Sequence, residues 1–135
     1  MRPTSIITLA LLLGSCSQST EVPASEPPEN GKYSGMFYFA ENGVTKSGAV
    51  TFAFEDTTYQ CTPNSLYLPP SGGGSYKVKP GIITLTDLVL HTAEFDWSLI
   101  LNGDFQYFRD GSKIVLTQGD VQRNRSRRIE IQKTQ

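Results

Sequence analysis

The chain has 135 residues, of which 19% are charged, and its formal net charge at pH 7 is −1. A net charge this close to zero gives no global field for nucleic acid or a strongly acidic substrate, so we expect no nucleic-acid partner. Its only cysteines are Cys16 and Cys61, which are too few for a disulfide framework.

The start of the chain has the pattern of a secretory signal. Arg2 supplies a positive charge, an apolar run extends from Ile6 to Leu13, and two small residues precede Cys16. A helix of about eight residues rises only ~12 Å, whereas the hydrocarbon of a bilayer is ~30 Å thick. We therefore predict a signal peptide over residues 1–15 and not a transmembrane helix.

The quartet Leu13-Gly14-Ser15-Cys16 resembles the lipobox of bacterial lipoproteins. The resemblance implies a diacylglyceryl group on the Cys16 thiol, cleavage before Cys16 and acylation of the new amino terminus. Several acyl chains on one residue give the stable anchor that a single chain does not. Ser17, where an aspartate would indicate inner-membrane retention in enteric lipoproteins, favours the outer membrane. The alternatives are an ordinary signal peptide with a chance cysteine and an uncleaved hydrophobic tail.

The next segment is rich in serine, proline and glutamate. Residues 17–30 read SQSTEVPASEPPEN and offer almost nothing to bury. Such a composition does not offset the entropy of ordering, so we predict a lipidated cysteine followed by a disordered tether over residues 16–30. Residues 31–135 then form one small domain.

The domain shows apolar residues at every second position, which is typical of β-strands. Turn signals separate the strands at Asn42-Gly43, Asn102-Gly103 and Asp110-Gly111, and a loop is expected at Pro69-Pro70 with Gly72–Gly74. Residues 88–95 are the one helix candidate and fit a strand and turn equally well. Predicted strands cover residues 33–39, 48–55, 66–68, 76–78, 82–86, 97–101, 105–109 and 113–118, and a last strand contains Ile129 and Ile131.

Strands this short and this close together predict an all-β domain. We expect a small antiparallel meander barrel of about eight strands, with a β-sandwich as the alternative. The layout resembles the small lipocalin-like barrels of bacterial envelope lipoproteins over residues 31–132, on Gly31-Lys32-Tyr33, the phrase AEFDWSLILNG and the last strand. Lipocalins carry G-x-W on the first strand, where this chain has tyrosine. Since an eight-stranded barrel is just wide enough for its own side chains or one small ligand, we expect the seven phenylalanines to fill it.

Few residues are arranged for chemistry. His91, Glu94 and Asp96 could approach one metal ion, but the chain has no second histidine for a usual zinc set. Ser98 with His91 and Asp96 lacks a nucleophile elbow, and residues 70–75, PSGGGS, lack the lysine of a phosphate-binding loop. We therefore predict no catalytic residue, no metal and no cofactor, and a protein that is not an enzyme.

The basic run RNRSRR is the one local concentration of charge. Arg123, Arg125 and Arg127 would share one face of a strand and could bind an anionic group or a partner, or could simply keep an edge soluble. Cys61 is expected to be a buried small apolar residue.

These features predict a lipid-anchored protein of the bacterial envelope. It would associate with the membrane through its amino terminus and act as a binding or scaffolding module for a small apolar ligand or an envelope protein. The alternative is a protein-interaction module, such as an envelope hydrolase inhibitor or an accessory of an assembly complex.

Overall fold

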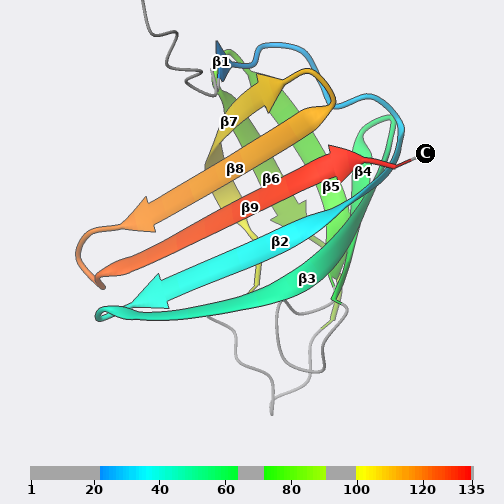
Figure 1. Cartoon of the computed structure of the whole chain (residues 1–135). Coiled ribbons are helices and arrows are strands. Elements are labelled where there is room, and N and C mark those ends of the chain that lie inside the picture. Colours follow the sequence, from blue (N-terminus) through cyan, green and yellow to red (C-terminus); the bar gives the residue numbers. More distant parts are fainter. Residues whose placement is uncertain (1–21, 64–71, 91–99, 135) are drawn as a thin grey trace, which may run out of the picture.

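The computed structural model describes residues 22–63, 72–90 and 100–134, and all regular structure in these residues is antiparallel β (Figure 1). The predicted all-β class is therefore confirmed. In this part of the chain no helix is both long and apolar enough to cross a membrane. The nine described strands are β1 (Val22–Pro23), β2 (Gly31–Glu41), β3 (Val44–Glu55), β4 (Thr58–Pro63), β5 (Gly72–Lys79), β6 (Ile82–Asp87), β7 (Gly103–Asp110), β8 (Lys113–Asp120) and β9 (Arg125–Lys133).

Eight of these strands close a barrel. Each strand from β2 to β8 pairs with the next one in the sequence, and β9 pairs back with β2. This is the predicted meander barrel and not the alternative sandwich. The short strand β1 is an addition that pairs with β7, opposite Phe108 and Arg109.

The interior follows from the alternation of the strands. Opposite residues of an antiparallel pair point to the same face, so the pair Tyr33–Phe52 and the pair Phe37–Gly48 both face inward. Each large apolar side chain buried in this way stabilises the fold by about 1.5–3 kcal/mol. The largest fully buried side chains are Tyr33, Phe37, Phe52, Phe54, Ile83, Leu85, Phe105, Tyr107, Ile114, Leu116, Ile129 and Ile131.

Four buried tyrosines have hydroxyl groups that reach the ends of the barrel. Their rings pack in the core, as in the edge-to-face contact of Tyr76 with Phe54 at 5.5 Å. Each hydroxyl donates to a backbone carbonyl: Tyr33 to Glu29 at 2.8 Å, Tyr76 to Asp56 at 2.5 Å, Tyr107 to Glu26 at 2.9 Å and Tyr59 to Leu101 at 3.2 Å. Desolvation raises the pKa of Tyr107 to about 12, which keeps its hydroxyl neutral and able to donate.

Residues 22–30 lie across one end of the barrel, and we call them the strap. The backbone N–H of Ala24 donates to the carbonyl of Tyr107 at 2.9 Å, and the N–H of Gly81 donates to the carbonyl of Ala24 at 2.8 Å. Ala24 and Pro28 are buried. These contacts correct the expectation that all of residues 16–30 would be disordered, because the strap supplies the carbonyls that two buried tyrosine hydroxyls need.

The two ends of the barrel differ, and Figure 1 shows them clearly. The strap end, at the top of the view, holds the strap and the turns that join β3 to β4, β5 to β6 and β7 to β8. The far end holds the turns after β2 and β8, together with the starts of β5 and β7.

Two predicted turns are wrong. Gly72–Gly74 begin strand β5 instead of forming a loop, since their missing side chains allow close strand contact: a Cβ on Gly74 would overlap the carbonyl oxygen of Thr86. Asn102-Gly103 does not join a hairpin, because residues 100–102 are not in a strand. The Asn102 side chain instead accepts a hydrogen bond from the N–H of Asp87 at 3.0 Å, which sets the entry into β7.

Candidate functional site

The three predicted arginines lie at the far end, but not all on one strand. Strand β9 begins at Arg125, so Arg123 lies in the turn before it, with its side chain 70% exposed. Arg125 and Arg127 are on β9 and share the face that includes buried Ile129, which points into the barrel. The barrel therefore directs two of the three arginines toward its own mouth.

Arg125 forms an ion pair across the pairing of β9 with β2. Its Nε lies 3.1 Å from Oε2 of Glu41, at an angle that does not make a hydrogen bond, while Nη2 donates to Oε1 at 3.4 Å. The two residues are direct partners in the strand register, and their side chains are 22% and 34% exposed. This pair links the two strands that close the barrel.

Arg127 covers the aromatic core at the same end. Its guanidinium carbon lies 5.6 Å from the centre of the Phe39 ring, within the range of a cation–π interaction. Its Nη1 donates to Oε1 of Gln118 at 3.0 Å, and Nε2 of Gln118 donates in turn to the carbonyls of Asn102 and Asp104. Arg127 thus joins β9 to β8 and to the start of β7.

Acidic groups balance these arginines. Asp120 lies 3.9 Å from Arg123, and Glu41 pairs with Arg125. An open depression of about 450 Å³ at this mouth is lined by Arg127 but also by Asp104 and Asp120. Among the described residues, the side chains at this mouth of the barrel are therefore polar and carry charges of both signs. An anion or partner contact by Arg123, Arg125 and Arg127 stays a prediction.

Several other predicted residues fall outside the described ranges. These are Cys16, the predicted strand at 66–68, and the His91, Glu94, Asp96 and Ser98 group. In residues 22–63, 72–90 and 100–134 no group of three histidine, cysteine or acidic side chains is placed to hold a metal ion.

Cys61 is buried, as expected, with 1% of its surface exposed. Desolvation, with a smaller contribution from Asp87, raises the pKa of the Cys61 thiol to about 12. The thiol is therefore neutral at physiological pH and far less nucleophilic than a thiolate.

The sequence did not reveal a second charged cluster, at the strap end. Oε2 of Glu29 accepts a hydrogen bond from Nζ of Lys133 at 3.0 Å, and Oε1 lies 4.0 Å from Nη2 of Arg109. The Lys133 hydrogen bond and charge, with a smaller effect of Arg109, lower the pKa of the Glu29 carboxyl. No local pattern in the sequence indicates this contact, since Glu29 and Lys133 are 104 residues apart along the chain.

No protein-family model, curated protein or solved structure matches this chain.

Proposed function

We propose that the protein is a lipid-anchored lipoprotein of the bacterial cell envelope, attached through Cys16 to the outer membrane. Its lipocalin-like barrel is a non-enzymatic binding or scaffolding module. The observation that carries this proposal is the lipobox-like quartet Leu13-Gly14-Ser15-Cys16, followed 15 residues later by a closed barrel that begins at Gly31. An acyl anchor followed by a stable domain is suited to holding one recognition surface at a membrane.

The packing of the barrel interior favours recognition at the surface of the domain instead of binding in a deep internal pocket. Phe52 stacks on Phe54 at 5.8 Å, and Tyr33 meets Phe54 edge-to-face at 5.4 Å, so aromatic rings occupy the described interior. A filled barrel is rigid, because close-packed side chains tolerate little volume change. Recognition of an envelope protein or a small apolar ligand would then use the ends or the outer face of the barrel.

A second candidate function is a protein-interaction module, such as an envelope hydrolase inhibitor. Exposed apolar side chains at the far end favour it: Val44 is 62% exposed, Val121 is 96% exposed and Leu90 is 98% exposed. Val121→Asp, with Gln122→Asp as its matched control in the same turn, would reduce crosslinking to an envelope protein if this end binds one. Equal crosslinking by both variants would reject this candidate.

The test of the proposed function is metabolic labelling with a fatty-acid analogue in the host. The wild-type chain should carry the label and sediment with the membrane fraction, whereas Cys16→Ala should lose both properties. Cys61→Ala is the matched control, since it removes the other cysteine and should keep both. Label on the Cys16→Ala protein, or none on the wild type, would refute the proposal.

A further inference from the structure

We infer that the strap fixes the orientation of the barrel, with the strap end facing the bilayer and the far end facing away from it. This inference rests on the proposed lipidation of Cys16. It goes further because it assigns one end of the domain to the membrane and the opposite end to the aqueous phase.

The first argument is the length of chain between the anchor and the folded body. From Cys16 to Val22 there are six residue steps, which span at most about 20 Å when fully extended. If the strap were free, the chain from Cys16 to Gly31 would reach about 50 Å, so docking of the strap removes more than half of the available reach.

The second argument is the size of the barrel compared with this short reach. The longest strand, β3, has 12 residues and spans about 40 Å, or about 30 Å along the axis of a barrel with the usual tilt. Val22 pairs with Arg109 near the strap-end turn between β7 and β8. A tether of at most about 20 Å therefore keeps this end near the lipid, while the far end lies up to about one barrel length further out.

The third argument is that the strap is held at several points. The backbone of Ala24 makes two hydrogen bonds with the barrel, and the Tyr33 and Tyr107 hydroxyls each donate one to the strap. Asn30 and Asp56 exchange two more, at 2.9 and 3.3 Å, and β1 pairs with β7. Glu29 adds the contacts with Lys133 and Arg109 described above. Ala24 itself is part of the hydrophobic core, with 8% of its surface exposed.

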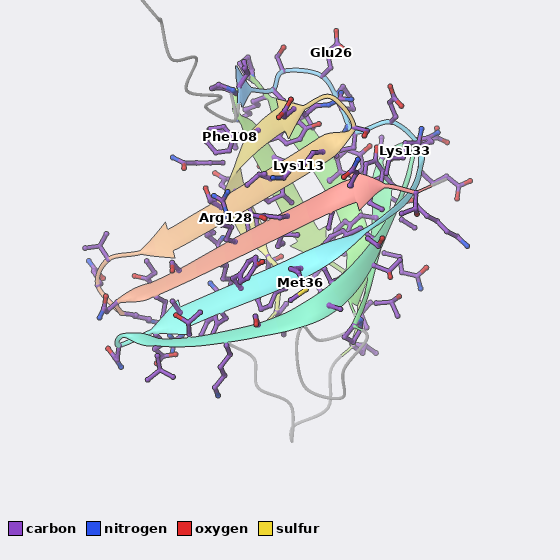
Figure 2. All side chains as sticks on the ribbon, viewed as in Figure 1. Glu26, Met36, Phe108, Lys113, Arg128 and Lys133 are labelled. Carbon is purple, nitrogen blue, oxygen red and sulfur yellow. The ribbon has the colours of Figure 1, made fainter. Side chains whose placement is uncertain are left out.

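The charge of the strap end allows close approach to an anionic membrane but does not by itself set the orientation. Figure 2 shows Glu26, Lys113 and Lys133 at this end. In the described residues, six basic and five acidic side chains lie near it: Lys32, Lys77, Lys79, Arg109, Lys113 and Lys133, against Glu26, Glu29, Glu55, Asp56 and Asp110. A net charge near +1 gives weak attraction at most, so the tether and the strap determine the orientation.

This orientation has a consequence for recognition. The strap covers the end of the barrel nearest the bilayer, so a ligand would not enter the barrel from the membrane side. The far end, with Arg125, Arg127 and the turns at residues 42–43 and 121–124, faces the aqueous phase.

The test measures the depth of each end in the full-length lipoprotein reconstituted in vesicles. Ser112→Cys, in the strap-end turn, and Gln122→Cys, in the far-end turn, each receive a thiol-reactive fluorophore. Buried Cys61 should add little label. Quenching by nitroxide-labelled lipid headgroups falls steeply with distance, so we expect it to be several-fold stronger at residue 112 than at residue 122.

The matched variants test the role of the strap. Ala24→Asp places a charge at a buried position and should release the strap, so that quenching at residues 112 and 122 becomes nearly equal. Ser25→Asp adds the same charge at the exposed neighbouring position and should leave the difference unchanged. Circular dichroism should report a folded barrel in both variants.

The outcomes separate this inference from the proposed function. Equal quenching at the two sites in an acylated, vesicle-bound wild-type protein would overturn the orientation alone, as would an unchanged difference in folded Ala24→Asp protein. A wild-type protein that carries no acyl group would overturn the proposed function and this inference with it.

Discussion

Replacement of Gly35 by alanine would test how closely β2 and β9 approach where they close the barrel. Gly35 lies opposite Ile131 in the register of these two strands. A Cβ at this position would overlap the carbonyl oxygen of Glu130 and would lie 2.8 Å from the carbonyl carbon of Glu130 and from Cα of Ile131. Because these are backbone atoms, no side-chain rotation can relieve the contact.

The expected cost follows from the displacement that the methyl group requires. Carbon atoms normally rest about 3.5–4.0 Å apart, so the two strands must separate locally by about 1 Å. Weakening two ladder hydrogen bonds costs about 1 kcal/mol each, and overpacking adds about 1–3 kcal/mol. Alanine restricts the unfolded chain and returns about 0.4–1 kcal/mol. The free energy of unfolding should therefore fall by about 2–4 kcal/mol, a large part of the roughly 5–15 kcal/mol of a typical domain.

Urea denaturation followed by far-UV circular dichroism measures this change. The matched control is Gly119→Ala on β8, where an added Cβ would meet no atom within 4 Å. Its free energy of unfolding should stay constant or rise slightly. In thermal melts Gly35→Ala should lower Tm by about 10 °C or more, at about 4 °C per kcal/mol. Equal free energies of unfolding for the two variants would show that β2 and β9 can separate near Gly35 without loss of stability.

Two further predictions concern stability. Burial raises the pKa of both Tyr107 and Cys61 to about 12, from 10.0 and 9.0, so the folded state disfavours their anions. The free energy of unfolding should therefore be unaffected by these two groups below pH 9 and should fall as the pH rises toward 12. Urea titrations at pH 8, 10 and 11 would measure this fall, and a free energy of unfolding that does not change with pH would contradict the reasoning. Arg125→Ala leaves half-buried Glu41 without its partner and should cost about 1–2 kcal/mol. Arg123→Ala, at a largely exposed side chain, should cost less than about 0.5 kcal/mol, and similar losses in both would show that the Glu41 contact is not stabilising.

The fold class could be predicted from the sequence because the patterns that indicate β-strands and turns involve only neighbouring residues. Alternation at Phe52 and Phe54, and the turns at Asn42-Gly43 and Asp110-Gly111, depend only on neighbouring residues. The same local reasoning failed at Gly72–Gly74 and at Asn102. Glycine permits a turn but also permits close strand contact, and only the neighbouring strand decides between them.

The arrangement of the charged residues was also predicted only where it depends on local sequence. The spacing of Arg125 and Arg127 predicted correctly that they share a strand face, but Arg123 lies in the turn because β9 begins two residues later. The sequence gives no indication that Glu41 is the partner of Arg125, since 84 residues separate them and only closure of β2 against β9 brings them together.

The strap is the clearest case in which tertiary structure decided the outcome. Taken by itself, a segment rich in proline and glutamate has too little apolar surface to offset the entropy of ordering. Its docking depends on groups that the barrel supplies, namely the hydroxyls of Tyr33 and Tyr107 and the N–H of Gly81. The sequence alone thus predicted most of the strands, the turns at Asn42-Gly43 and Asp110-Gly111, and the candidate lipid attachment site, which are encoded in adjacent residues. It did not predict β4, which pairs with β3 and β5. The tertiary structure alone decided which distant residues complete the two ends of the barrel.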